Sequence, residues 1–294
     1  MTTTKTTQTT HTLKAPGATL TYDHRRIQST TEPILFLIGS PMGAAGFGTL
    51  AGHFPDRTIL TYDPRGSERS EKDDPADHVD PEIHAGDLHR VIEAVGEGPV
   101  DLFASSGGAV NALALVSRHP EQVRILVAHE PPLAGILADG EAALAVTSAV
   151  QETYQRSGWG AGMAHFIAVT AHEGPFTENE LVPPDPSMFG LPTADDGSRV
   201  DVLLGQNMVT CTHYQPDFEA LKHASTRIVV AAGEKSGGQM ASRGAHAVAE
   251  RLGQELVLFP GDHGGFLGGE YGQTGDPEAF AAKLAEVLIS AAKG

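Results

Sequence analysis

Short apolar runs rich in β-branched residues alternate with stretches of helical periodicity, and this alternation constrains the fold more than any other feature of the chain. It is typical of βαβ units, in which helices join parallel strands and cover the faces of the sheet. The runs predicted as strands are 18–22, 34–38, 58–62, 100–104, 123–128, 226–232 and 255–259. The expected fold class is therefore α/β, with a mainly parallel sheet flanked by helices.

Two of the connecting helices can be placed from the residues at their ends. Asp80 precedes Pro81, which is the order of an N-cap and a proline at the first helical position, and Gly96 suits the end of that helix. Asp276 and Pro277 repeat the signal for a last helix near the C-terminus.

The alternation stops between residues 132 and 224, where only helical stretches are predicted, at 141–155, 160–171 and 199–211. We interpret residues 132–224 as a helical cap over a site, inserted into an α/β core made of residues 13–131 and 225–294. Residues 1–12 are expected to be a disordered leader. The cap contains large apolar side chains that we expect to line a pocket: Trp159, Met163, Phe166, Met188 and Phe189.

Charge and cysteine content exclude several classes of function. Lys and Arg number 20 against 37 Asp and Glu, a net charge of −17, so the chain lacks the basic surface that nucleic acid or an anionic membrane would need. The one cysteine, Cys211, cannot form an intramolecular disulfide. No stretch approaches the ~18 consecutive apolar residues of a membrane span, and we expect a cytoplasmic, soluble protein.

The strongest signal for chemistry is the sequence Val-Asp-Leu-Phe-Ala-Ser-Ser-Gly-Gly-Ala at residues 100–109. A strand ends and a helix begins around a serine with small neighbours, which is typical of a nucleophile elbow, because that strained turn has no room for large side chains two residues away. Ser106 has Ala104 and Gly108 at those positions, whereas Ser105 would have Phe103. Ser106 is therefore the predicted nucleophile.

Three further segments resemble the α/β-hydrolase superfamily. Residues 34–41 (ILFLIGSP) resemble its oxyanion loop, residues 62–70 (YDPRGSERS) its D-x-R-G-x-G-x-S turn with Glu68 at the second glycine, and residues 259–266 its loop with the catalytic histidine. The resemblance implies backbone N–H donors at Ser40 and Gly107 for an oxyanion. It also implies that His263, which follows the last predicted strand, is the general base, in the chain order serine, acid, histidine.

The acid is less clearly marked. The family's usual position after the penultimate strand is Ser236, in Gly-Glu-Lys-Ser at 233–236, and serine cannot stabilise an imidazolium as a carboxylate does. Glu130 follows the preceding strand. Its place in the chain resembles that of the acid in zearalenone lactonases and in many haloalkane dehalogenases. The dehalogenases have an aspartate as nucleophile, whereas this chain has Ser106. We predict Glu130 as the acid, with Glu234 as the alternative.

The sequence therefore predicts a serine hydrolase that cleaves a carboxylic ester or lactone through Ser106, His263 and Glu130. No Walker or Rossmann glycine pattern and no paired histidines with zinc spacing are present, so neither a cofactor nor a metal is expected. The expected partner is a small-molecule ester or lactone, and a homodimer is one assembly that the sequence allows. Two other hypotheses stay open: a non-catalytic ligand-binding homologue, and a perhydrolase or C–C hydrolase with the same triad.

Overall fold

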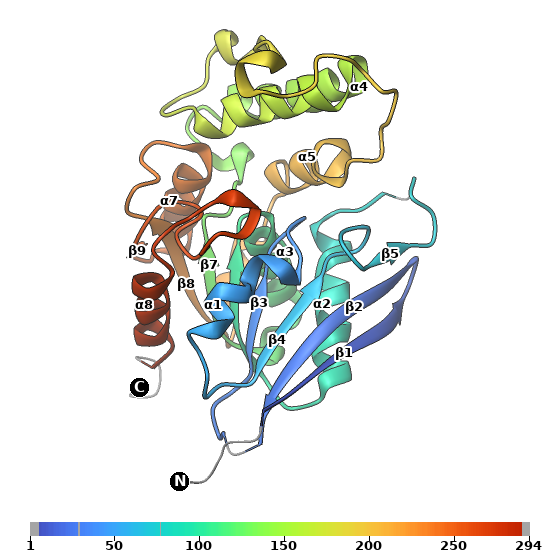
Figure 1. Ribbon diagram of the computed structural model, residues 1–294. Coiled ribbons are helices and arrows are strands. Elements are labelled where there is room, and N and C mark those ends of the chain that lie inside the picture. Colours follow the sequence, from blue (N-terminus) through green and yellow to red (C-terminus); the bar gives the residue numbers. More distant parts are fainter. Residues whose placement is uncertain (1–5, 29, 77, 290–294) are drawn as a thin grey trace.

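A twisted, mostly parallel sheet forms the centre of the molecule, as seen in the computed structural model, which describes residues 6–28, 30–76 and 78–289. The order across the sheet is β1-β2-β4-β3-β6-β7-β8-β9, with β5 paired to β2 (Figure 1). From β4 to β9 neighbouring strands are parallel, whereas β1, β2 and β5 pair in antiparallel fashion. The strands are β1 (Thr6–Ala15), β2 (Ala18–Ile27), β3 (Leu35–Ile38), β4 (Ile59–Asp63), β5 (Glu71–Lys72), β6 (Val100–Ser105), β7 (Val123–His129), β8 (Arg227–Gly233) and β9 (Val257–Phe259).

Helices cover both faces of this sheet. One apolar core lies between the sheet and α2, α3, α6 and α7, and a second lies between the sheet and α1 and α8. The helices are α1 (Gly48–Gly52), α2 (Pro81–Val95), α3 (Gly107–Arg118), α4 (Gly140–Ala171), α5 (Met208–Thr212), α6 (Phe218–His223), α7 (Met240–Leu252) and α8 (Pro277–Ile289). Shorter helical turns are η1 (Ala44–Phe47), η2 (Pro120–Gln122), η3 (Ala134–Ile136), η4 (Glu178–Leu181), η5 (Pro186–Phe189), η6 (Leu203–Asn207) and η7 (Glu270–Gly272).

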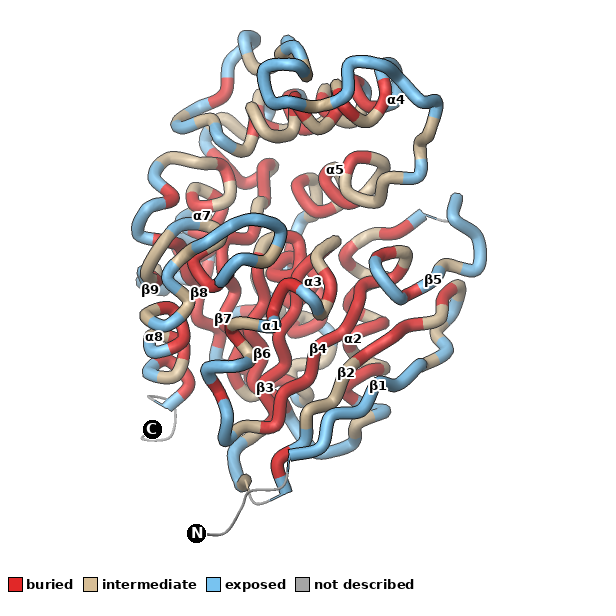
Figure 2. Tube along the Cα trace, in the orientation of Figure 1, coloured by how far each residue is buried: buried red, intermediate tan, exposed pale blue. Residues whose placement is uncertain are grey.

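The predicted strands and helix ends are present. All seven apolar runs overlap a strand, and Asp80 caps α2 by accepting a hydrogen bond from the Ile83 N–H, while Gly96 ends this helix in the left-handed conformation. Burial explains the pattern: β3, β4 and β6 are buried along their whole length (Figure 2). Strands covered on both faces read as continuous apolar runs, which is why they stand out in the sequence.

The disordered leader expected at residues 1–12 is wrong for residues 6–12, which belong to β1; residues 1–5 lie outside the described part of the chain. β1 pairs with β2 in antiparallel register from Thr6 opposite Ile27 to Ala15 opposite Ala18. Its side chains are mostly exposed, so it shows no apolar pattern (Figure 2). Its threonines are β-branched and suit an edge strand.

The cap consists of helices that lie over one end of the sheet, with α4 and α5 uppermost in Figure 1. Helix α4 is interrupted at Gly158, whose φ of 85° divides it into the two stretches predicted from the sequence. Helix α6 packs against α3 and α7 and so belongs with the core, although the expected cap, 132–224, includes it. Among the described residues, no helix has the length and apolar character needed to cross a membrane.

Candidate active site

The turn between β6 and α3 forces Ser106 into an unusual backbone conformation. Its φ is 58° and its ψ is −129°, in a region that non-glycine residues rarely occupy. The Ser106 N–H donates to the carbonyl oxygen of His129 at 2.9 Å, and the Ser106 carbonyl accepts from the Ala109 N–H, which begins the helix. The turn therefore places the Ser106 side chain at the helix N-terminus, where it lines a cavity of about 500 Å³, called here the site cavity.

The two glycines after Ser106 allow α3 to approach the loop after β3. A Cβ on Gly107 would lie 2.7 Å from the carbonyl oxygen of Ser40, and a Cβ on Gly108 would lie 2.7 Å from the Cα of Gly39. No side chain fits at either position without a backbone shift. This close approach brings Ser40 and Gly107, the two predicted oxyanion donors, to the wall of the site cavity.

Glu130 lies buried behind the wall of the site cavity and is hydrogen bonded to His263, which lines the cavity. Glu130 follows β7 with a φ of 51°, is fully buried, and its Oε2 lies 2.5 Å from Nδ1 of His263. Its Oε1 accepts from the Gly233 N–H at 2.8 Å. Burial favours the neutral acid, but the His263 hydrogen bond and the nearby imidazoles outweigh it and lower the pKa of Glu130 to about 2. A carboxylate at Nδ1 holds the proton there and leaves Nε2 as the acceptor.

Glu234, Ser236 and Asp262 do not take the place of Glu130 at Nδ1 of His263. Glu234 is exposed, and its backbone N–H rather than its side chain bonds to the sheet, at the carbonyl oxygen of Phe259. Ser236 is buried beside Gly233. The Asp262 carboxylate accepts from the Gly264 N–H, so it does not face its neighbour His263.

Ser106 and His263 line the same cavity, and among the described residues no hydrogen bond joins them. In the described part of the chain the Ser106 hydroxyl makes no hydrogen bond, and the His263 side chain is 40% exposed. Serine and base are often looser in an empty site than in a complex with substrate. The arrangement can therefore deprotonate Ser106 once a substrate excludes water and draws the two groups together.

A buried histidine that the sequence did not single out lies beneath the site. His129 ends β7, its Nδ1 is 3.2 Å from the Ser105 hydroxyl, and its ring centroid is 6.0 Å from that of His263. Burial lowers the pKa of His129 to about 4, so the ring is neutral at pH 7. Four aromatic rings surround it: Phe103, Phe259, Phe266 and Phe280. His129 thus adds a neutral ring to the apolar surroundings of His263. In the sequence, only its position next to Glu130 could have indicated that it lies near the site.

The walls of the site cavity are largely apolar and come from both core and cap. The core contributes Met42, Phe266, Leu267 and Tyr271, and the cap contributes Phe166, Ile167, Leu203 and Met208. Of the five apolar cap residues expected to line a pocket, only Phe166 does so. Trp159 and Met163 pack inside the cap, and Met188 and Phe189 are exposed, because the segment that carries them lies on the outer side of α4.

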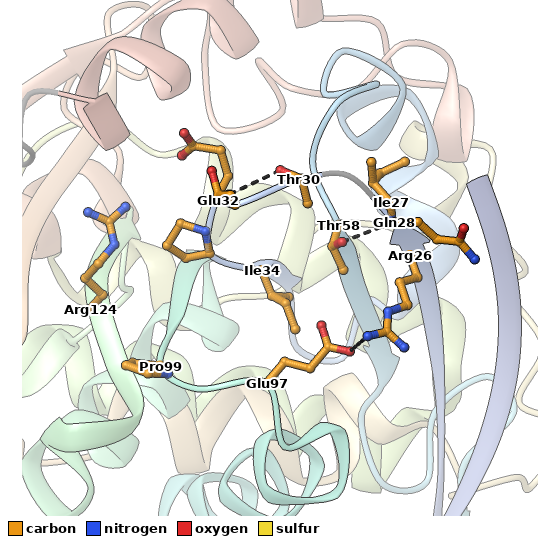
Figure 3. Close-up of a pocket in the computed structure, with 12 residues that line it drawn as sticks. Arg26, Ile27, Gln28, Thr30, Glu32, Ile34, Thr58, Glu97, Pro99 and Arg124 are labelled. Atoms are coloured by element: carbon orange, nitrogen blue, oxygen red, sulfur yellow. Dashed lines mark hydrogen bonds and ion pairs between the residues drawn. The ribbon is translucent and has the colours of Figure 1, made fainter. Parts of the chain in front are cut away.

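A second cavity, of about 780 Å³, lies at the opposite end of the sheet (Figure 3). Ile34 and Pro99, which precede β3 and β6, are in its wall. Its Arg26 pairs with Glu97 at 3.0 Å, and Arg124 pairs with the buried Asp101 at 2.6 Å. Among the described residues that line it, none is a serine or a cysteine, and ligands of α/β sheets bind instead at the carboxyl ends of the strands.

Comparisons with known proteins agree with this fold. A family model described as the alpha/beta hydrolase fold matches residues 32–195. An uncharacterized hydrolase, YraK of Bacillus subtilis (strain 168), is 30% identical over 260 residues, which are 87% of this chain and 89% of that protein.

Two solved structures illustrate the similarity of fold. The enol-lactonase from Burkholderia xenovorans LB400 is 14% identical with a TM-score of 0.63, over 95% of this chain and 100% of that one. A thermophilic esterase from Thermogutta terrifontis is 18% identical with a TM-score of 0.65, over 98% of this chain and 99% of that one.

Proposed function

This chain belongs to the α/β-hydrolase fold family and is a hydrolase, and we propose that it cleaves carboxylic esters or lactones with Ser106 as the nucleophile. The observation that carries the proposal is the 2.5 Å contact between Glu130 and His263, on the wall of the cavity that Ser106 lines from its strained turn. A buried acid, a histidine and a serine in this order match the roles of acid, base and nucleophile.

The proposed reaction proceeds through an acyl-enzyme. Ser106 Oγ attacks the carbonyl carbon while Nε2 of His263 takes the hydroxyl proton. The carbonyl oxygen becomes an oxyanion held by the backbone N–H groups of Ser40 and Gly107, an interaction worth about 3 kcal/mol per donor. Collapse breaks the ester C–O bond, and the leaving oxygen takes the proton from His263. Water then attacks the acyl carbon while His263 takes its proton. The acyl C–Oγ bond breaks, Ser106 Oγ takes the proton back from His263, and the acid is released.

The cavity walls suggest the size of the substrate. The site cavity, about 500 Å³ and lined by apolar side chains from core and cap, has room for a bulky or aromatic acyl group. An acetyl group would contact few of these apolar side chains and would gain little binding energy from them. The similarity in fold to an esterase and to an enol-lactonase supports ester or lactone chemistry for this chain.

The proposal can be tested with a panel of p-nitrophenyl esters, from acetate to aryl acyl groups, together with macrolactones. Hydrolysis should be fastest for the bulky members and should disappear in Ser106→Ala. Ser105→Ala is the matched control and should retain activity within about tenfold, because Ser105 bonds to His129 and not to the Glu130–His263 pair.

Other outcomes would assign a different activity. Cleavage of a carbon–carbon bond in a β-diketone, or peracid formation from hydrogen peroxide, without ester turnover would replace the ester hypothesis. Tight binding of a lactone without any turnover would favour a ligand-binding protein.

A further inference from the structure

Asn207 lies at the seam between the cap and the core. It is the last residue of the π-helical turn η6, and α5 follows it directly. Leu204 and Met208 on either side of it are buried in the cap core, whereas Cys211, one turn further, is buried in the main core. A π turn widens the helix by one residue and is often found at functional sites. Here it places Asn207 in the wall of the site cavity.

The Asn207 side chain connects the cap to the oxyanion loop. Its Nδ2 donates to the hydroxyl oxygen of Ser40 at 2.7 Å, across a sequence separation of 167 residues. Both residues are buried, with 5% of Asn207 and 6% of Ser40 exposed. A buried hydrogen bond of this kind fixes both side chains, because loss of either partner leaves a desolvated polar group.

This hydrogen bond also determines what the Ser40 hydroxyl can do. An oxygen that accepts the amide proton directs its own hydrogen elsewhere, and among the described residues the Ser40 hydroxyl donates to no protein atom. Ser40 lines the site cavity together with Ser106 and Gly107. Its hydroxyl hydrogen is thus not taken up by another described protein group, and the residue lines the same cavity as the candidate nucleophile.

We propose that the Ser40 hydroxyl is a third donor to the oxyanion, beside the N–H groups of Ser40 and Gly107, and that Asn207 is the positioning residue that orients it. This inference rests on the proposed serine-hydrolase function. It makes the oxyanion hole depend on the cap, since the amide that orients the hydroxyl belongs to η6 and not to the core.

A double-mutant cycle with Ser40→Ala, Asn207→Leu and the double variant tests the proposal on the best ester of the panel. Each single substitution should lower kcat by about 10²-fold with little change in KM, because the interaction strengthens only in the transition state. The double variant should be no slower than the slower single variant, because Asn207 acts through Ser40. Asn179→Leu, the same change at an exposed cap position, should leave kcat unchanged.

Several results would overturn the proposal. Wild-type kcat in Ser40→Ala would remove the third donor, and this variant suffices even where Asn207→Leu does not fold by circular dichroism. A loss in the double variant equal to the product of the two single losses would give Asn207 an independent, structural role. Wild-type protein that hydrolyses no ester and is not labelled by a fluorophosphonate would refute the proposed function itself, and this inference with it.

Discussion

Replacing Glu130 by glutamine should impair catalysis while preserving the shape of the site. The pKa of Glu130 is lowered from 4.5 to about 2, and because the group is fully buried, this difference corresponds to roughly 3 kcal/mol of preference for the carboxylate, at about 1.4 kcal/mol per pH unit. Much of that preference comes from His263. A neutral amide cannot supply it when His263 becomes an imidazolium during attack by Ser106.

The expected loss follows from two effects. Loss of one hydrogen bond to a charged group, worth up to about 3 kcal/mol, lowers kcat by roughly 10²-fold. The glutamine amide can also donate to Nδ1 and favour the wrong tautomer, and in a comparable triad such an exchange lowers kcat by ~10⁴-fold. We therefore expect kcat of Glu130→Gln to fall by about 10²–10⁴-fold, with KM little changed.

The assay is steady-state hydrolysis of the best p-nitrophenyl ester, with Glu234→Gln as the matched control. The Glu234 side chain is exposed, whereas that of Glu130 is buried and bonded to His263 and Gly233. The substitution of Glu234 should therefore lower kcat by less than about tenfold. A large loss in Glu234→Gln together with a small loss in Glu130→Gln would refute the assignment of the acid.

Three further predictions concern packing, pH and substrate. Gly107→Ala should lower both kcat and the melting temperature, because its Cβ would lie 2.7 Å from the Ser40 carbonyl oxygen; an active variant of unchanged stability would contradict the close approach. Burial lowers the pKa of His84 to about 3 and of His129 to about 4. The unfolded chain therefore binds more protons below pH 6.5, and the free energy of unfolding in urea should fall as the pH is lowered from about 6.5 to 4. His84→Gln should reduce that slope, and an unchanged slope would exclude His84 as its source. Phe166→Ala should slow aryl esters more than acetate, and equal effects on kcat/KM would remove Phe166 from the acyl site.

The sequence was sufficient for the parts of the molecule where local constraints are strong. Strands buried on both faces need continuous apolar runs, and a strained turn needs small neighbours, so β6 and Ser106 could be placed without a structure. Glu130 could be proposed because Ser236 carries no charge. The strand β1 was not predicted, and residues 6–12 were expected to be disordered instead, because an exposed edge strand has no apolar pattern.

Contacts between distant segments could not be predicted. The bond from Asn207 to Ser40 joins a π turn in the cap to a loop 167 residues earlier, and neither residue has a spacing that points to the other. The apolar residues of the cap that line the cavity could not be predicted either, because the composition of α4 does not show which of its faces lies toward the core. Phe166 faces the cavity, whereas Met163, three residues earlier, packs within the cap.

The central claim, that Ser106 is the nucleophile of this site, is tested most directly by mapping the adduct of a fluorophosphonate by peptide mass spectrometry. We predict one phosphonyl group per chain, located on Ser106, formed in wild-type protein and in Ser105→Ala and absent in Ser106→Ala. A label that persists in Ser106→Ala and disappears in Ser105→Ala would contradict the assignment.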